Sequence, residues 1–219
     1  MLSKKSGKKI FNMTQYFEYS HIETDYLKSK DEKMSRLIEK VGHIYRTVNP
    51  DLYSCLTDSI VGQQISTAAH NTIRNRIFEK FGTLTPEKVV GIPDDELKSV
   101  GISYRKVAYI KDFSQKIVDN QFNVENITKM SDEDAIDRLV SLKGVGKWTA
   151  EMMLTFSMCR PDVLSYGDLA IRRGIMKLYG LEELSEAEFH NLTDKFSPYR
   201  TTAALYFWHY ANPKCDFTV

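Results

Sequence analysis

The chain has 219 residues, of which 42% are hydrophobic and 27% charged, and its formal net charge at pH 7 is +1. This is the composition of an ordinary globular protein with one large or two small domains, and the near-zero charge excludes a histone-like binder that relies on bulk electrostatics. Its three cysteines, Cys55, Cys159 and Cys215, are widely spaced, so a disulfide framework and a zinc site are both unexpected and a reducing compartment fits.

No stretch of the sequence approaches the roughly 20 apolar residues of a membrane span, so no membrane partner is expected. The first nine residues are rich in lysine, and residues 10–15 are too polar to form the core of a signal peptide. We interpret the basic segment as a solvated tail, with an arm that touches phosphate groups as the alternative.

Apolar residues recur at helical spacing almost throughout, which predicts an all-α fold. Only residues 12–22 are expected to be extended. A first helix is predicted to end near Asn49-Pro50, and further helices are predicted over residues 51–64, 66–81, 85–90, 93–100 and 103–119. Ser131-x-x-Asp134 and Ser185-x-x-Glu188 have the capping-box form and predict two more helix starts, and the last helix is predicted to run from about residue 198 to 210.

The most informative segment is Leu142-Lys-Gly-Val-Gly-Lys-Trp-Thr-Ala150. Its two glycines, Gly144 and Gly146, predict a tight turn whose backbone N–H groups point outward at the start of a helix. Unpaired amides and the helix dipole both favour an anion there. A helix, a Gly-x-Gly turn and a second helix form the helix–hairpin–helix pattern, which holds a DNA phosphate without reading base sequence.

Asp168 follows Gly167 and precedes a helical segment, so it is predicted to be an N-cap. A cap is worth about 1 kcal/mol and needs no further role. The helix N-terminus also stabilises the ionised carboxylate, however, and such a group beside a DNA-binding turn can face positive charge that develops on a sugar. The two roles are compatible.

Four other positions allow two interpretations each. Trp148 and Tyr199 are either core side chains or aromatic walls on which a base stacks. Gln64, in the segment Val61–Ser66, is either a polar helix end or a side chain that fills the base stack. Residues 100–106 are either an ordinary capped loop or a second phosphate contact. The histidines lack metal-binding spacing, so a metal site built from them is not expected.

Residues 59–66, 142–150 and 163–168 together resemble the HhH-GPD superfamily of DNA glycosylases, and within it the AlkA/Mag-like 3-methyladenine DNA glycosylase II branch. The resemblance spans roughly residues 51–208. It implies two helical lobes that flank an active-site cleft. One lobe would comprise residues 51–158, ending in the helix–hairpin–helix motif at 139–155, and the other residues 1–50 together with 159–219.

The resemblance also implies site residues. Asp168 would be the catalytic carboxylate, Gln64 the wedge that enters the duplex, and Trp148 and Tyr199 the base pocket. Phosphate contacts would come from Gly144, Gly146, Lys147 and Thr149. In relatives the hairpin carbonyls bind a monovalent cation, which implies a structural Na⁺ or K⁺ here at the carbonyls of Val140, Leu142 and Val145.

The implied activity is that of a monofunctional, monomeric glycosylase that flips alkylated purines, of the 3-methyladenine and 7-methylguanine type, out of duplex DNA and hydrolyses them off in base excision repair. Relatives with lyase activity carry a nucleophilic lysine where this chain has Trp148, so no lyase activity is expected. Three scattered cysteines cannot form the four-cysteine iron–sulfur cluster of other branches. Met152 and Leu169 stand where some relatives have pocket tyrosines, which leaves the lesion spectrum open.

Two alternatives remain at this point. The chain could be a glycosylase for another lesion, such as hypoxanthine or an oxidised base, or a non-catalytic helix–hairpin–helix module that binds DNA. The expected location follows the DNA: the cytoplasm (nucleoid) in a prokaryote and the nucleus in a eukaryote.

Overall fold

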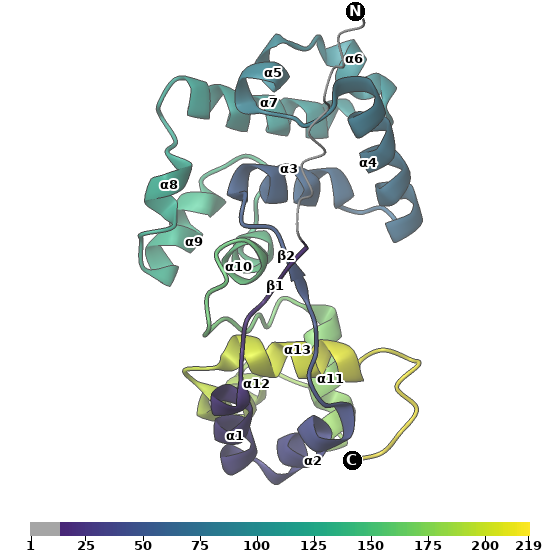
Figure 1. Cartoon of the computed structure of the whole chain (residues 1–219), viewed down its shortest axis with the longest axis vertical. Helices are drawn as coiled ribbons and strands as arrows, with labels where there is room; N and C mark the ends of the chain where they lie inside the picture. Colours follow the sequence, from purple (N-terminus) through teal and green to yellow (C-terminus); the bar gives the residue numbers. More distant parts are fainter. Residues whose placement is uncertain (1–13) are drawn as a thin grey trace, which may run out of the picture.

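Residues 14–219 are described by the computed structural model, and their regular structure is helical apart from one short antiparallel ribbon. The helices form two lobes stacked along the long axis of the molecule, with α10 (Lys147–Phe156) at the level where the lobes meet (Figure 1). The predicted all-α class is confirmed. Within the described range, no helix combines the length and the apolar character that crossing a membrane requires.

The first lobe is built around one apolar face of each of its helices. In chain order these are α3 (Leu52–Gly62), α4 (Thr67–Phe81), α5 (Pro86–Gly91), α6 (Asp94–Ser99), α7 (Tyr104–Val118), α8 (Val124–Ile127) and α9 (Asp132–Val140). Leu56 and Ile60 of α3 are buried with Ile110 and Phe113 of α7, and α10 belongs to the same core through Ala150. Such faces recur at helical spacing, so their burial fixes how the helices pack.

The second lobe joins segments from the two ends of the chain. It contains α1 (His21–Lys30), α2 (Glu32–Val41), α11 (Leu169–Tyr179), α12 (Glu186–Thr193), a 3₁₀ turn (Asp194–Phe196) and α13 (Arg200–Tyr210). Its core combines Leu37 of α2, Ile175 of α11 and Phe207 of α13. Helices α11 and α13 approach closely at Gly174, where an added Cβ atom would lie 2.1 Å from the Phe207 carbonyl oxygen. Asp168 is therefore carried by a helix whose position is tightly fixed.

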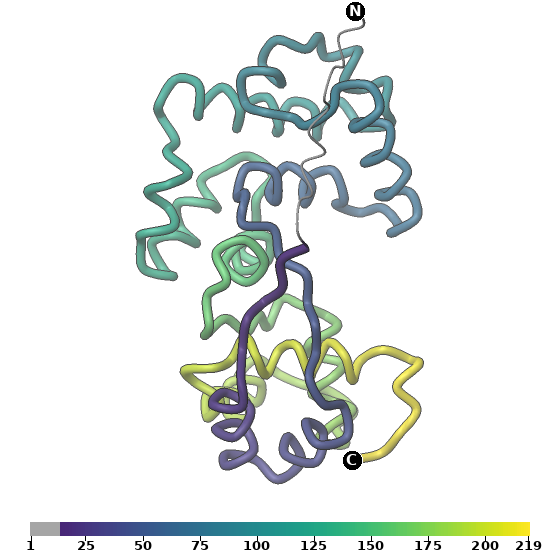
Figure 2. Tube along the Cα trace, in the orientation of Figure 1, coloured from purple at the N-terminus to yellow at the C-terminus, as the bar shows by residue number. Residues whose placement is uncertain are grey.

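The ribbon consists of β1 (Gln15–Tyr16) and β2 (Thr47–Val48), paired antiparallel with Gln15 opposite Val48. It runs beside α10 from the second lobe towards the first (Figure 2). The Asn49 amide donates to the Phe156 carbonyl at 2.8 Å, which ties the end of the ribbon to the end of α10. The chain passes between the lobes through β2, which leads from α2 to α3, and through residues 157–168, which lead from α10 to α11.

The structure corrects the sequence-based prediction at this ribbon. The helix predicted to end near Asn49-Pro50 ends at Val41, because Gly42 follows in a left-handed conformation (φ +72°). The apolar residues beyond it that continued the helical spacing, among them Val48, belong to the ribbon or its approach instead. A glycine at this point is a common helix stop, and it outweighed the periodicity.

The N-terminal segment differs as well. Of the segment 12–22 expected to be extended, the structure describes residues 14–22, and strand conformation is found there only at Gln15–Tyr16. Helix α1 starts at His21 because Ser20 and Glu23 form a complete capping box. The capping box predicted at Ser185 and Glu188 is also complete, whereas Ser131 accepts the Asp134 amide without the full reciprocal pair. The basic segment at the start of the chain lies outside the described residues.

Candidate active site

The predicted hairpin is the turn between α9 and α10. Gly144 adopts a left-handed conformation (φ +79°), and a Cβ atom there would lie 2.2 Å from the Tyr109 ring, so the position requires glycine twice over. Gly146 is the N-cap of α10 and no side chain caps that helix start. The first amides of α10 therefore remain available for an anion, as the sequence predicted.

The predicted phosphate contacts differ in how they are presented. Gly146 and Lys147 are exposed, while the Thr149 side chain is buried, which leaves its main-chain amide as the group near the helix start. Lys143, which precedes the turn, has a partner within the protein. Its Nζ lies 2.7 Å from Oδ1 of Asp112 on α7, and this ion pair ties the hairpin to α7. Hydrogen bonds from Lys116 and Lys143 hold the pKa of Asp112 below its usual range.

Asp168 occupies the predicted N-cap of α11. Its Oδ1 accepts the Ala170 and Ile171 amides at 2.8 and 3.0 Å. Its Oδ2 accepts the indole Nε1–H of Trp148 at 3.1 Å. The carboxylate is 7% exposed. One oxygen is therefore committed to the cap, and the other is directed at the first turn of α10, beside the hairpin.

The two predicted base-pocket aromatics lie in different surroundings. Trp148 is 44% exposed and neighbours Asp168, next to Leu169, which is 51% exposed, so an aromatic face and an apolar side chain lie open beside the carboxylate. Tyr199 packs edge-on against Tyr26 of α1, with ring centroids 5.2 Å apart. No hydrogen bond or ring contact joins Tyr199 to Trp148 or Asp168 in the part of the chain that the structure describes, so its role at the base stays a prediction.

The structure adds Glu151, which the sequence analysis did not select. Glu151 lies one turn after Trp148 on α10 and accepts the hydroxyl hydrogen of the fully buried Ser165, in the turn that leads to Asp168. Burial raises the pKa of Glu151, with the Ser165 hydrogen bond and Lys147 opposing and Asp168 adding to the rise. The i, i+3 spacing of Trp148 and Glu151 on one helix was the available signal.

Arg46, beside β2, is a second addition. Its guanidinium lies over the Phe156 ring at 4.7 Å and over the Trp208 ring at 5.8 Å. Burial lowers the pKa of Arg46, and the Asp168 carboxylate opposes that change. A cation therefore lies within electrostatic reach of Asp168 on the ribbon side, a relation between residues far apart in sequence that no motif indicates.

Gln64 is exposed at the corner between α3 and α4 and adopts a left-handed conformation (φ +56°) that is unusual for a residue with a side chain. The Arg105 guanidinium donates to its Oε1 at 3.4 Å, and the neighbouring Gln63 donates from Nε2 to the Gly144 carbonyl at 2.9 Å. The predicted wedge and the predicted hairpin thus lie side by side. In residues 100–106, the two cations, Arg105 and Lys106, bond to this loop. A second phosphate contact there stays a prediction.

The hairpin carbonyls suit the cation that the resemblance implies. Val140, Leu142 and Val145 lie at the end of α9 and in the turn, where helix-terminal carbonyls lack intrahelical donors. The Leu142 carbonyl accepts the Val145 amide at 3.2 Å and keeps a second lone pair. Neutral carbonyl oxygens are hard ligands, so the donor set fits Na⁺ or K⁺. In residues 14–219 no cluster of three or more His, Cys, Asp or Glu side chains could hold a metal.

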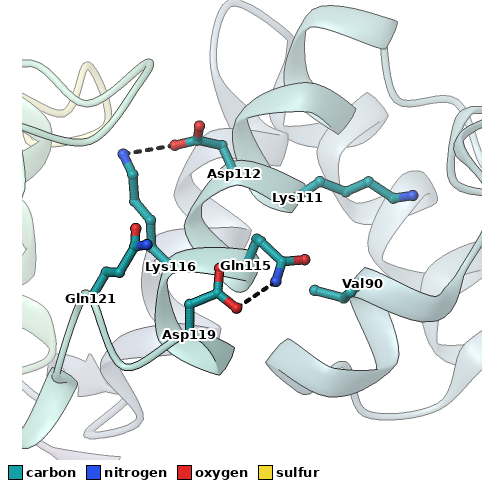
Figure 3. Close-up of a pocket in the computed structure, with 7 residues that line it drawn as sticks. All are labelled: Val90, Lys111, Asp112, Gln115, Lys116, Asp119 and Gln121. Atoms are coloured by element: carbon teal, nitrogen blue, oxygen red, sulfur yellow. Dashed lines mark hydrogen bonds and ion pairs between the residues drawn. The ribbon is translucent and has the colours of Figure 1, made fainter.

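Two surface hollows lie away from this region. The larger, about 420 Å³, lies between α5 and α7 and is lined by charged and amide side chains, with Lys116 reaching Asp112 (Figure 3). The other, about 340 Å³, lies between α1, α2 and Tyr206. Neither includes Asp168 or Trp148, and the larger holds the Lys116–Asp112 ion pair, so the candidate active site remains the region around Asp168.

Comparison with known proteins agrees with this geometry. DNA-3-methyladenine glycosylase 1 of Schizosaccharomyces pombe is 30% identical over 196 residues, covering 84% of this chain and 84% of the relative. The crystal structure of a DNA-3-methyladenine glycosidase from Bacillus halodurans matches with a TM-score of 0.82 at 30% identity, over 93% of this chain and 95% of that one. The Schizosaccharomyces pombe 3-methyladenine DNA glycosylase in complex with abasic DNA matches with a TM-score of 0.75 at 30% identity, over 85% and 95% of the two chains.

The family model described as HhH-GPD superfamily base excision DNA repair protein matches residues 57–198, a range that contains Gln64, the hairpin and Asp168. The match therefore includes both the backbone turn that can hold a phosphate and the carboxylate beside it. The similarity extends over most of this chain, 84% of it for the first relative and 93% for the Bacillus halodurans structure. This chain belongs to the HhH-GPD superfamily of base excision DNA repair proteins.

Proposed function

We propose that this chain is a DNA glycosylase that flips alkylated purines, of the 3-methyladenine and 7-methylguanine type, out of duplex DNA and removes them by hydrolysis in base excision repair. The observation that carries the proposal is the hydrogen bond from Trp148 to Asp168, which fixes a carboxylate beside the hairpin. The names of the relatives support the substrate class, and a complex of one of them with abasic DNA supports duplex DNA as the partner.

Binding begins with the DNA backbone. The free amides at the start of α10 and the Lys147 ammonium hold a phosphate near the damaged nucleotide. A monovalent ion at the carbonyls of Val140, Leu142 and Val145 would supply positive charge behind the turn. Gln64, exposed at its corner, enters the space that the flipped base leaves.

The chemical step breaks the bond between C1′ of the deoxyribose and the base nitrogen. An N3- or N7-alkylated purine already carries positive charge, so it leaves with the bonding electron pair as a neutral base and needs no strong general acid. Positive charge moves to the sugar, and the Asp168 carboxylate stabilises it. Water then adds to C1′ and loses a proton with Asp168 as the base, which leaves an abasic site.

Trp148 contributes to binding rather than to bond formation. Its exposed indole face attracts a cationic base, while its N–H orients Asp168. An indole cannot form the imine that a lyase reaction requires, so we expect hydrolysis without strand cleavage.

Base release from methylated duplex DNA tests the proposal directly. The protein is incubated with duplex treated with a methylating agent, released bases are separated chromatographically, and alkali then cleaves the abasic strand. We expect free 3-methyladenine or 7-methylguanine, and strand breaks only after alkali. Unmethylated duplex is the control. The absence of any released base under single-turnover conditions, with DNA binding intact, would leave a non-catalytic DNA-binding module as the correct interpretation.

A further inference from the structure

Lys106, in the first turn of α7, is a buried cation that the proposed reaction does not use. It is 9% exposed, and its Nζ donates to the carbonyls of Val61 at 2.7 Å and Gln63 at 2.6 Å. Both carbonyls lie at the end of α3, where helix-terminal carbonyls need donors. Burial lowers the pKa of Lys106, and the charge of Arg105 adds to this.

The pairing is unusual because the partners are neutral. No carboxylate bonds to Lys106 within residues 14–219. Burying an ammonium is costly unless hydrogen bonds replace its water. The two carbonyl hydrogen bonds replace that water, so they are the interactions that hold the ammonium at this position.

The two carbonyls belong to the segment that joins α3 to α4 and carries Gln64, which we call the Gln64 corner (residues 61–66). A left-handed residue with a side chain persists only where its surroundings enforce it. Lys106 restrains the corner from α7, and Gln63 restrains it from the other side through its hydrogen bond to the Gly144 carbonyl of the hairpin. The loop is therefore held between the first lobe and the phosphate-binding turn.

We propose that Lys106 and Gln63 are positioning residues that hold the Gln64 corner in its inserting conformation and couple it to the hairpin. The inference rests on the proposed function, since it concerns how the conformation of the wedge residue, Gln64, is maintained before DNA binds. A corner ordered before DNA binds spares the complex the cost of ordering it during insertion. Because the Gln63–Gly144 bond joins the corner to the hairpin, a phosphate held at the hairpin also places the corner against the duplex.

A wedge is needed only where the base is stacked and paired. In a single strand the base is already accessible, and flipping costs little. Loss of the hydrogen bonds from Lys106 or Gln63 should therefore slow base release from duplex DNA much more than base release from a single strand that carries the same lesion. A variant that merely weakened the fold would lower both rates together.

The test compares Lys106→Met with Lys116→Met, a control on the same helix whose ammonium pairs with Asp112 at the surface hollow. Single-turnover base release is measured on 7-methylguanine in duplex and in single-stranded DNA. We expect the ratio of duplex to single-strand rates to fall about tenfold or more in Lys106→Met and in Gln63→Ala, since small misplacements of a positioning group have effects of this size. In Lys116→Met the ratio should stay within about twofold of wild type.

A second measurement does not depend on catalysis. A 2-aminopurine next to an abasic site in duplex DNA brightens when a side chain enters the stack and separates it from its neighbour. We expect wild type and Lys116→Met to brighten this probe at saturating protein, and Lys106→Met to lose most of the signal. An unchanged rate ratio, an equal loss on both substrates, or full brightening by Lys106→Met would overturn the inference. If the wild-type protein brightens the probe but releases no base, the proposed function is rejected, while the inference that Lys106 and Gln63 position the corner is retained.

Discussion

Substitution of Asp168 by asparagine separates the charge of this residue from its shape. The asparagine oxygen can still accept the Ala170 and Ile171 amides that Oδ1 accepts now at 2.8 and 3.0 Å, so the cap of α11 survives. The asparagine NH2 group would take the place of Oδ2 and face the indole N–H of Trp148. Because both groups are donors, that hydrogen bond is lost, at a cost of about 1 kcal/mol in stability. The fold and the hairpin should remain intact.

The effect on the reaction should be much larger. A carboxylate about 4 Å from the positive charge of the sugar, in surroundings of effective dielectric about 20, stabilises it by about 4 kcal/mol. Loss of this stabilisation corresponds to roughly a thousandfold slower base release. Asp168 is 7% exposed, which supports a dielectric well below that of water.

The assay is single-turnover release of 7-methylguanine from duplex DNA, with affinity for an abasic duplex measured in parallel. We expect the rate constant to fall about a thousandfold while the dissociation constant changes by less than about threefold, because the phosphate contacts lie on α10. A rate within tenfold of wild type, with unchanged affinity, would refute Asp168 as the group that stabilises the sugar.

Three further predictions concern contacts of α10, of α11 and of the loop between them. Glu151→Ala removes the acceptor of the Ser165 hydroxyl and should slow single-turnover base release about tenfold, whereas Glu151→Gln keeps an acceptor and should stay within about threefold. Gly174→Ala drives a methyl group into the α13 carbonyl and should lower the free energy of unfolding by about 3 kcal/mol in denaturant titration, and equal stability would contradict the packing. Hydrogen bonds from Arg200 outweigh burial and lower the pKa of Asp162, so its contribution to stability is present above an unfolded pKa of about 3.9 and is lost as the pH falls below it. Asp162→Asn should therefore lower the melting temperature at neutral pH, and its difference from wild type should shrink as the pH falls below about 4; a difference that does not change with pH would contradict the assignment.

The sequence predicted the parts of the site that are contiguous in the chain. The hairpin follows from Gly144 and Gly146, because a left-handed turn with no room for a Cβ atom accepts little else. The N-cap at Asp168 follows from its place before a helical pattern. In both cases the physical cause lies within a few residues of the signal, and local rules suffice.

The supports of the site were not predictable in this way. The Glu151–Ser165, Lys106–Val61 and Arg46–Phe156 contacts join residues that are distant in sequence or lie on different helices. No spacing rule encodes such a pair, because it exists only once the helices are packed. The ribbon was missed for a related reason: two strands of two residues carry no period, and their pairing is a long-range contact.

The geometry of α10 explains why these local and distant features act together. Its N-terminal amides have no side-chain cap and are the proposed phosphate site, Trp148 in its first turn donates to Asp168, and Glu151 one turn on accepts from Ser165. A rigid helix rises about 1.5 Å per residue, so these groups keep fixed separations. Asp168 itself caps α11, and the Trp148 and Glu151 hydrogen bonds tie its turn to α10. In the proposed function, a phosphate at the hairpin and the carboxylate that faces the sugar are therefore positioned by the same helix and its two hydrogen bonds.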